Sequence, residues 1–418
     1  MHKGMGIAFA VAVSALLGCG AADAAGDTIK IGFFATLEGT YTSLGEDGQH
    51  GFDLALQQHH NVAGGKKLEI IRGSSDASPD SALRAARKLV EQDKVDILIA
   101  PLSGAEGIAV HDYAKTQPQV TFINGCSAAL ETTYVNPAPN FFRFNLDGAQ
   151  IHKGLGEYIY NVKHYKKIAT IAEDYAFTYT QVFGLALDYC PAGGQISKRL
   201  WVPLGTKDFA SYIPQLLSED VDAIYLGLGG ADALNFLKQS QQAGGHAKLI
   251  GGSIMIDQTV LGSKGKAKDA LIGVPSATHW ADTWDDPHWQ AFVKAFQEAS
   301  KGARPGFCAV NYYDATSAVL QALDKVKGDL GDGHKKFREA LASLVLDAPN
   351  GQIKLDENRQ AIGTVFVTEV VKDQHGDLVN KVVNIVPNVQ ERLGLSKAAF
   401  DRIGLPGREV PVCKKVYD

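Results

Sequence analysis

The sequence predicts an α/β protein built from two doubly wound parallel-sheet lobes. Short, continuous apolar runs typical of strands alternate with amphipathic segments typical of helices, and this alternation occurs twice, before and after Phe144. Such a pattern is typical of parallel sheets that are covered on both faces. The chain has 418 residues, and 45% of them are hydrophobic. This length exceeds that of a domain built around one hydrophobic core. Two domains are therefore expected.

The elements of the two units follow from local patterns. In the first unit, Ser78 before Pro79 predicts a helix start, because Ser caps helices and Pro is favoured at the first helical position. The other segments follow from periodicity. The expected strands are 29–34, 67–72, 95–100 and 120–124, then 168–172, 196–202, 222–226 and 248–251. The expected helices are 46–60, one from 79, 106–115, 178–189, 209–218 and 231–243.

The C-terminal third breaks this alternation. Helices are expected at 287–300, 312–327 and 335–345, followed by strands at 351–355, 364–371 and 378–386. This order suits a chain that returns to the first unit and then crosses again into the second. Residues 391–418 are expected to form a peripheral tail that is attached through Cys413.

The N-terminus carries an export signal, expected over residues 1–24. An apolar run from Met5 to Gly18 follows a short basic start, and it is too short to span about 30 Å of hydrocarbon. Two cleavage sites compete. Ala22-Asp23-Ala24 is favoured because it adjoins the first strand more closely, while Leu16-Leu17-Gly18-Cys19 is similar to a lipoprotein box that would lipidate Cys19. Either site predicts a location outside the cytoplasm.

Charge and cysteine content exclude several classes of partner. The net charge is −5 and no Lys/Arg run is present, so nucleic acid is not an expected partner. The exported chain retains Cys126, Cys190, Cys308 and Cys413, which permit three disulfide connectivities in an oxidising compartment. None has the C-x-x-C spacing of a zinc or redox site, and no cofactor is expected.

Several short blocks occur in a family-specific order. They are Ile29-Lys30-Ile31-Gly32-Phe33, Leu44-Gly45-Glu46, Asp76-Ala77-Ser78-Pro79, Ala100-Pro101-Leu102-Ser103-Gly104, Ala172-Glu173-Asp174-Tyr175-Ala176 and Tyr312-Tyr313-Asp314-Ala315. In this order the chain resembles the type I periplasmic binding proteins of the branched-chain amino-acid (leucine-binding) family. The resemblance covers nearly all of the exported chain.

That resemblance implies two lobes joined by a three-crossing hinge, with crossings near Leu146, Ser276 and Leu346. Lobe I would comprise 27–146 plus 277–346, and lobe II 147–276 plus 347–390. It further implies a monomeric, periplasmic substrate-binding protein of an ABC transporter, which closes on a small-molecule carboxylate and presents it to an ABC permease in the inner membrane. Physical reasoning agrees, because ligands of open α/β sheets bind beyond the C-terminal strand ends, where helix N-termini favour anions.

Carried over residue by residue, the carboxylate-binding serine of the family falls on Ser103. The second part of the carboxylate clamp falls on Cys126, Ser127 and Ala128. For Ser103 and Ser127 the alternative is ordinary helix capping. Cys126 would be either a free thiol or part of a disulfide that supports the loop.

One departure from the family concerns the ligand. Amino-acid binders place an acidic residue where this chain has Ser253, and an ammonium in a closed cleft without a counter-charge is costly. The expected ligand therefore has a carboxylate without an amine. Aromatic residues predict that it has a ring, as in benzoate or cinnamate derivatives, and His279 is expected to hydrogen-bond a phenol or second acid group. The remaining expected contacts are Tyr41, Leu44, Tyr175, Phe177, Gly229 and Tyr313. Binding of a branched-chain or other hydrophobic amino acid is the alternative.

The residues that could indicate an enzyme or a metal-binding protein do not have the required spacing. Gly227-Leu228-Gly229-Gly230 lacks the third glycine of a dinucleotide loop, where Asp232 stands, and Gly251-Gly252-Ser253-Ile254-Met255 is no nucleophile elbow. His279, Asp282 and His288, like the pair His59-His60, do not have the spacing of a zinc ligand set. The sequence therefore predicts neither catalytic residues nor a metal site.

Overall fold

The computed structural model describes residues 1–2 and 28–413. The expected export signal, its two cleavage sites and Cys19 lie outside these residues. Among the helices within 28–413, none combines the length and the apolar character required to cross a membrane.

The first unit is a six-stranded sheet with the strand order β2-β3-β1-β4-β5-β6. Only the β2–β3 pair is antiparallel. Its strands are β1 (Thr28–Thr36), β2 (Val62–Ala63), β3 (Lys66–Ser75), β4 (Ile97–Ile99), β5 (Thr121–Ile123) and β6 (Phe141–Phe142). Its helical segments are η1 (Gly39–Tyr41), α1 (Thr42–Gln58), α2 (Pro79–Arg87), η2 (Lys88–Gln92), α3 (Gly104–Ala114) and α4 (Glu131–Tyr134). As expected, Ser78 caps α2, and its side chain accepts a hydrogen bond from the Ser81 N–H at 3.3 Å.

The second unit is a four-stranded parallel sheet with the order β10-β9-β7-β8. Its strands are β7 (Lys167–Glu173), β8 (Gln195–Val202), β9 (Ala223–Gly227) and β10 (Leu249–Gly251). Its helical segments are α5 (Gly148–Ile151), α6 (Leu155–Asn161), α7 (Ala176–Tyr189), α8 (Ile213–Leu217), α9 (Gly230–Gln242), α10 (Gln258–Leu261) and η3 (Ala267–Leu271). Helix α8 is shorter than the expected 209–218.

The C-terminal third contributes to both units. Helix α12 packs closely on α1, where the Ala309 carbonyl oxygen would lie 2.0 Å from a Cβ placed on Gly51. The strands form a third sheet, β11-β14-β13-β12 with β15 beside β14, and all of its pairs are antiparallel. The elements are β11 (Pro275–Thr278), α11 (Pro287–Ala299), α12 (Phe307–Lys325), α13 (Gly331–Ala342), β12 (Val345–Ala348), β13 (Gly351–Leu355), β14 (Ala361–Lys372), β15 (Leu378–Val389) and α14 (Lys397–Ile403).

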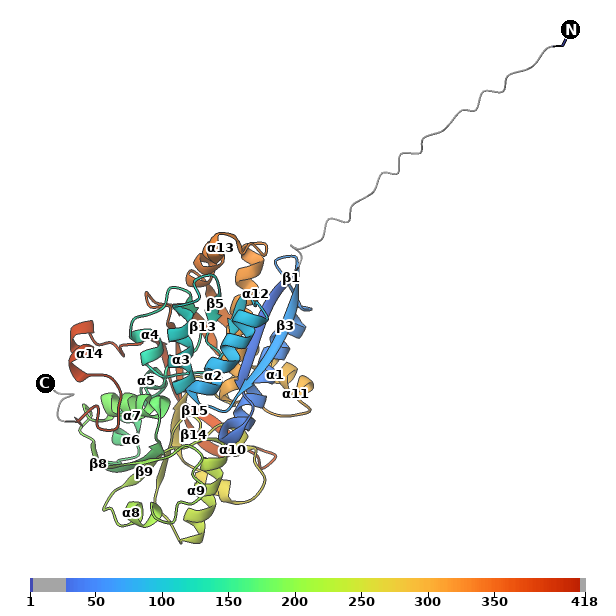
Figure 1. Cartoon of the computed structure of the whole chain (residues 1–418). Helices are drawn as coiled ribbons and strands as arrows, with labels where there is room; N and C mark the ends of the chain where they lie inside the picture. The colour runs from blue at the N-terminus through green and yellow to red at the C-terminus, as the bar shows by residue number, and fades with distance from the viewer. Residues whose placement is uncertain (3–27, 414–418) are drawn as a thin grey trace.

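Strands β14 and β15 of this third sheet lie between the two parallel sheets, whereas β13 lies in the upper half of the view (Figure 1). In Figure 1 the first sheet and α12 occupy the upper half, the second sheet with α8 and α9 the lower half, and β14 and β15 the middle. The hinge positions expected at Ser276 and Leu346 fall in β11 and β12, and Leu146 lies just before α5. The chain thus passes from the first unit to the second and returns, while the lobe boundaries stay a prediction.

A disulfide attaches the C-terminal tail to the second unit. Cys413 pairs with Cys190, the residue that ends α7. In α14, the Phe400 ring packs against Tyr134 of α4 and Phe183 of α7, with ring centroids 5.1 and 5.7 Å apart. The tail therefore contacts both units.

Candidate functional site

A small cavity of about 20 Å³ lies between the two units. It is lined by residues from both: Tyr41, Leu44, Leu102, Ser103, Gly104, Cys126, Ala128, Tyr175, Phe177, Ile254, Phe307 and Cys308. Most of these residues follow β1, β4, β5, β7 and β10, at the C-terminal ends of parallel strands. Ligands of open α/β sheets bind at such edges, because loops and helix N-termini converge there.

The N-terminus of α3 supplies the polar wall of the cavity. The Ser103 hydroxyl donates a hydrogen bond to the Ala77 carbonyl at 2.9 Å and accepts one from the Glu106 N–H at 3.3 Å, so Ser103 caps the helix as well as lining the cavity. The first N–H groups of a helix have no partner within it. Within residues 28–413, nothing accepts a hydrogen bond from the backbone N–H of Gly104 or of Ala128. These two N–H groups are available to an anion.

The two units approach each other closely at Gly104. A Cβ placed on this residue would lie 2.8 Å from the Phe177 Cβ and 2.9 Å from the Phe177 backbone nitrogen. A second close contact joins Gly230, which has a φ of +49°, to Thr40, whose carbonyl oxygen would lie 2.3 Å from the added Cβ. Glycine is required at both places because the backbones of the two units touch there.

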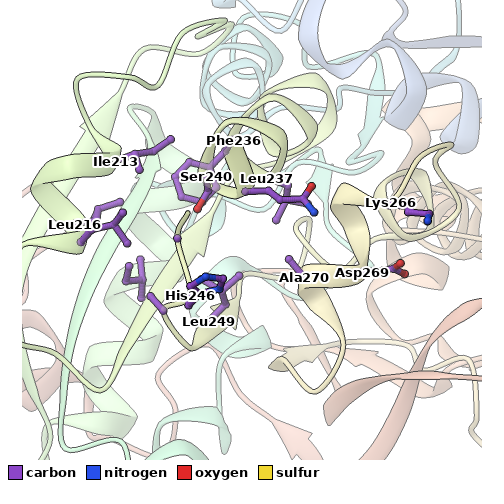
Figure 2. A pocket seen from close by; sticks show the side chains of 15 residues that line it. Ile213, Leu216, Phe236, Leu237, Ser240, His246, Leu249, Lys266, Asp269 and Ala270 are labelled. Atoms are coloured by element: carbon purple, nitrogen blue, oxygen red, sulfur yellow. The ribbon is translucent and has the colours of Figure 1, made fainter. Parts of the chain in front are cut away.

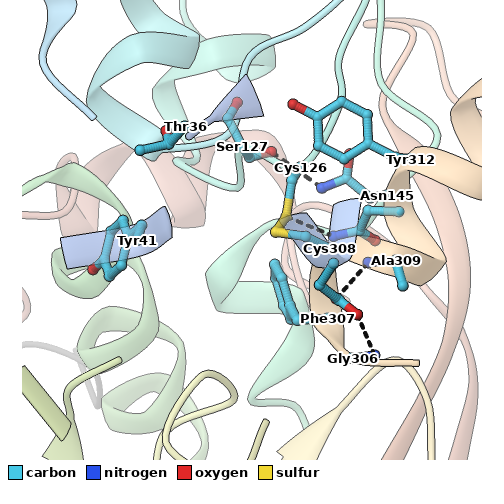
Figure 3. Close-up of a disulfide and its surroundings, with 12 residues drawn as sticks. Thr36, Tyr41, Cys126, Ser127, Asn145, Gly306, Phe307, Cys308, Ala309 and Tyr312 are labelled. Atoms are coloured by element: carbon cyan, nitrogen blue, oxygen red, sulfur yellow. Dashed lines mark hydrogen bonds between the residues drawn. A yellow bond between two sulfur atoms is a disulfide. The ribbon is translucent and has the colours of Figure 1, made fainter. Parts of the chain in front are cut away.

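A disulfide between Cys126 and Cys308 forms another wall. It joins the loop after β5 to the first turn of α12, across 182 residues of sequence. The Cys126 N–H donates to the Pro101 carbonyl at 2.8 Å, which holds this loop against the one that precedes α3. Figure 3 shows the disulfide beside Phe307, with Tyr41 apart from it on the other side of the view. Of the possibilities left open for Cys126, the disulfide is the one found.

Tyrosine hydroxyls and a buried acid lie at the far end of the cavity. The Tyr41 hydroxyl donates to the Glu173 carboxyl and lies 2.8 Å from the Tyr175 hydroxyl, and the Gly229 N–H donates to Glu173 Oε1 at 3.0 Å. Burial, more than any other cause, raises the pKa of Glu173 well above its usual range. Burial, followed by the charge of Glu173, raises the pKa of Tyr41. These hydrogen bonds link η1 of the first unit to β7 and α9 of the second.

A pair of buried acids lies at the N-terminus of α12. Asp47 of α1 accepts hydrogen bonds from the N–H groups of Gly306 and Ala309, at 3.1 and 2.8 Å, and Asp257 before α10 accepts one from Phe307 at 2.5 Å. Burial raises the pKa of both carboxyls, and the charge of Asp257 raises that of Asp47 further. The two acids satisfy the helix N-terminus, and they bring together elements of both units.

Seven of the twelve expected ligand contacts line this cavity: Tyr41, Leu44, Ser103, Cys126, Ala128, Tyr175 and Phe177. Three others lie directly behind its wall. Ser127 donates to Asn124 Oδ1 at 2.5 Å, Gly229 binds Glu173, and Ser253 accepts from Gln181 Nε2 at 2.5 Å. Ile254, next to Ser253, faces the cavity instead.

The other two expected contacts lie farther away. His279 is separated from the cavity by Phe307, with ring centroids 4.9 Å apart. Tyr313 is not at this cavity, which corrects the expectation, since its hydroxyl donates to Gln58 at 2.6 Å and its ring packs on Phe292. The physical reason is the helix period: Tyr312 faces the core, where its hydroxyl donates to the Phe34 carbonyl at 2.8 Å, so the next residue turns away.

Sequence reasoning missed Leu102, Gly104, Ile254, Phe307 and Cys308. Phe307 and Cys308 were missed because the helix was expected to begin at residue 312. Pro305-Gly306 would have signalled the earlier start of α12. The Glu173 acid was also missed, since its burial depends on the contact between the units.

A larger hollow of about 330 Å³ lies elsewhere, in the second unit between α8, α9 and η3. Figure 2 shows its apolar lining, which includes Leu216, Phe236 and Leu237, with His246 and Lys266 nearby. It contains none of the expected ligand residues. Among residues 1–2 and 28–413, no group of three or more His, Cys, Asp or Glu side chains is arranged to hold a metal ion.

Comparison with known proteins decides the family. Residues 28–375 match the periplasmic binding protein family. The chain belongs to this family. The expected fold class and the expected role as a substrate-binding protein of the ABC transporter type are thereby confirmed.

Several relatives of this periplasmic binding protein are similar over most of their length. A solute-binding protein of Rhodopseudomonas palustris, solved with 3,4-dihydroxybenzoic acid, is 28% identical with a TM-score of 0.80, over 87% of this chain and 99% of that one. A second from R. palustris, solved with benzoate, is 25% identical with a TM-score of 0.80, over 88% and 99%. Leu/Ile/Val-binding protein homolog 7 of Brucella melitensis is 25% identical over 84% of this chain and 90% of its own.

Proposed function

We propose that this periplasmic binding protein captures a small aromatic carboxylate between its two lobes and presents it to an ABC permease in the inner membrane. One observation carries the proposal: the interlobe cavity combines unpartnered backbone N–H groups with a wall of rings and aliphatic side chains. We assign lobe I to 27–146 plus 277–346 and lobe II to 147–276 plus 347–390.

The carboxylate would bind at the N-terminus of α3. The free N–H groups of Gly104 and Ala128 lie at the cavity, and a helix N-terminus also carries partial positive charge. Ser103 would act chiefly by holding these groups in place, because its hydroxyl is already engaged by Ala77 and Glu106. Among residues 28–413, no Lys or Arg side chain lines the cavity, so backbone dipoles would supply the stabilisation of the anion.

The ring would bind against Phe177 and Phe307, whose centroids lie 5.8 Å apart. Leu44, Leu102 and Ile254 complete an apolar wall. Two relatives solved with benzoate and 3,4-dihydroxybenzoic acid support an aromatic acid as the ligand.

Capture would require movement of the lobes. The cavity of about 20 Å³ is far smaller than the roughly 300 Å³ or more of ligand pockets. The lobes touch at Gly104–Phe177 and at Thr40–Gly230. We therefore assign this structure to the closed arrangement, from which the lobes separate to admit a ligand, and the Tyr41–Glu173 hydrogen bond would form only on closure.

A branched-chain amino acid is the second candidate ligand. Relatives named as Leu/Ile/Val-binding proteins support it, and Glu173 is a buried acid near the cavity. Against it, both Glu173 oxygens are engaged by Tyr41 and Gly229, and the side chain after β10 that faces the cavity is the apolar Ile254. An ammonium group would lack a counter-charge there.

The remaining parts of the proposal concern the cellular setting. We infer a periplasmic, monomeric protein without catalytic activity, either free after cleavage at Ala22-Asp23-Ala24 or attached to the membrane through a lipidated Cys19. The family match supports the periplasmic location.

Thermal unfolding with benzoate, 4-hydroxybenzoate, leucine and isoleucine tests the ligand class. A ligand at 100 times its Kd stabilises the folded state by about 2.7 kcal/mol. Stabilisation by the aromatic acids and not by the amino acids is the expected result. Stabilisation by leucine or isoleucine alone would establish the second candidate instead.

A further inference from the structure

Behind Phe307 lies a group of buried polar side chains that the function described so far does not use. We call it the polar cluster: His279, Trp280, Asn311, Asp314 and Asn350. All but Asn350 are at most 2% exposed, and Asn350 is 6% exposed. The Asn350 amide donates to the His279 carbonyl at 3.2 Å, and the His279 and Trp280 ring centroids are 5.2 Å apart.

Among residues 28–413, many polar atoms of this cluster have no partner that forms a hydrogen bond of good geometry with them. They are both ring nitrogens of His279, Trp280 Nε1, Asn311 Oδ1, Asn350 Oδ1 and both carboxyl oxygens of Asp314. A buried polar atom without a partner is costly, and several together in one place demand a physical reason. A side-chain hydrogen bond with Asn311 partly offsets the lowered pKa of His279, and one with Asn350 partly offsets the raised pKa of Asp314. A polar group that enters from outside the cluster would complete its hydrogen bonding.

The cluster adjoins the ligand cavity directly. Asn311 lies one helical turn after Phe307 and Cys308 on α12, and its Nδ2 lies 3.6 Å from the Cys126 sulfur that lines the cavity. The Phe307 ring stands between Phe177 and His279, with centroid distances of 5.8 and 4.9 Å. Phe177 in turn contacts Gly104 at the proposed carboxylate site. The rings of Phe177 and Phe307 therefore lie between the carboxylate site and the cluster.

We propose that the polar cluster recognises a hydroxyl group on the ring of the bound acid, so that the protein selects phenolic acids over unsubstituted benzoate. This inference rests on the proposed function. A ligand ring that packs against Phe177 and turns the Phe307 ring aside, while keeping contact with it, would bring a hydroxyl opposite the carboxylate toward His279 and Asn311. Side-chain movements of this kind are common on binding.

The chemistry of the cluster favours a hydroxyl over other substituents. Its acceptors are oxygens of Asn311, Asp314 and Asn350, and its donors are Trp280 Nε1, one N–H of His279 and, in the protonated form of the carboxyl, the O–H of Asp314. Burial lowers the pKa of His279 to about 3, so the ring is neutral and both donates and accepts. A hydroxyl can do both as well.

Two other groups fit less well. Burial raises the pKa of Asp314 well above its usual range, and the cluster contains no Lys or Arg, so a second carboxylate would find no counter-charge. An α-ammonium group lies next to its own carboxylate and would not reach past the Phe307 ring to the cluster. The cluster therefore excludes dicarboxylic acids and makes no contact with an amino-acid ammonium.

Calorimetric titration of the purified exported chain with benzoate, 4-hydroxybenzoate and 3,4-dihydroxybenzoate tests the inference. The wild-type protein is expected to bind at least one hydroxylated acid roughly tenfold or more tightly than benzoate, because a site built for a hydroxyl rejects the analogue without it. His279→Phe and Asn311→Leu should each abolish most of this preference and leave benzoate binding within about threefold. His288→Phe, at a side chain that is 70% exposed, is the matched control and should retain the preference.

The outcomes separate the two proposals. An unchanged preference in both cluster variants, or equal affinities of the wild-type protein for all three acids, would overturn the role of the cluster while aromatic-acid binding stands. No binding of any of the three acids would overturn the proposed function itself, and the inference with it. If His279→Phe does not fold, Asn311→Leu and the wild-type affinities still decide.

Discussion

Replacing Gly104 by alanine places one methyl group at the point where the two lobes touch. Gly104 begins α3 in the first unit, and Phe177 lies in the first turn of α7 in the second unit. The new Cβ would lie 2.8 Å from the Phe177 Cβ and 2.9 Å from its backbone nitrogen. Because carbon atoms pack at about 3.5–4.0 Å, the lobes must move apart by roughly 0.7 Å at this point.

The expected cost follows from that overlap. An extra methyl group in a well-packed contact costs about 1–3 kcal/mol, and the atoms it meets here belong partly to the backbone, which cannot rotate away. If closure is required for binding, this cost weakens ligand affinity by roughly 5- to 150-fold. The open protein does not bear the cost, and the backbone N–H at position 104 is retained.

Titration calorimetry with the aromatic acid that binds best measures this change. Gly407→Ala is the matched control, since no heavy atom lies within 4 Å of its added Cβ, and its affinity should equal that of the wild-type protein. Thermal unfolding without ligand checks that Gly104→Ala folds normally. Wild-type affinity in a folded Gly104→Ala protein would refute the reasoning that the bound form has this lobe contact.

Three further predictions concern the walls of the site and the buried acids. Replacing Cys126 and Cys308 by serine should reduce the free energy of unfolding by about 2–5 kcal/mol in urea titrations and weaken ligand binding. The matched control replaces Cys190 and Cys413 by serine, and this double variant should lose stability but keep its ligand affinity. Equal ligand affinity in the two double variants would contradict a role of the Cys126–Cys308 disulfide in the cavity wall. Tyr41→Phe removes one hydrogen bond to Glu173 and should weaken ligand binding by about 1–3 kcal/mol in calorimetry. An unchanged Kd would show that this hydrogen bond does not stabilise the closed form. Asp47 has a raised pKa in the folded protein, so its stabilising contribution is complete below the unfolded value of about 3.9 and is lost as the pH rises above it. The urea midpoint of the wild-type protein should therefore fall more steeply between pH 5 and 8 than that of Asp47→Asn. Parallel curves of midpoint against pH would contradict a raised pKa of Asp47 in the folded protein.

The sequence predicted the parallel units well because their strands are buried on both faces and are therefore continuously apolar. The start of α2 was predicted at Pro79, and the start of α3 was predicted two residues late, at 106 instead of Gly104. Ser78 and Ser103, the residues before these starts, both cap their helices. The third sheet was harder to predict, because its strands were recognised while their antiparallel pairing, such as Gly363 with Val389, depends on contacts distant in sequence.

The candidate site was predictable where it follows strand ends. Ser103, Cys126 and Ala128 come directly after β4 and β5, and they line the cavity. Residues that reach the site through interlobe packing were not predictable: Ile254 and Phe307 are ordinary apolar residues until the lobes meet. Likewise, no local signal distinguishes Tyr312, which faces the core, from Tyr313, which faces away from it.

Small-angle X-ray scattering with and without a saturating aromatic acid tests the central claim most directly. We predict that the radius of gyration decreases when benzoate or 4-hydroxybenzoate is added, because the ligand stabilises contacts that only the closed lobes make. Identical scattering curves for free and bound protein, with binding established by calorimetry on the same sample, would contradict capture by closure of the lobes.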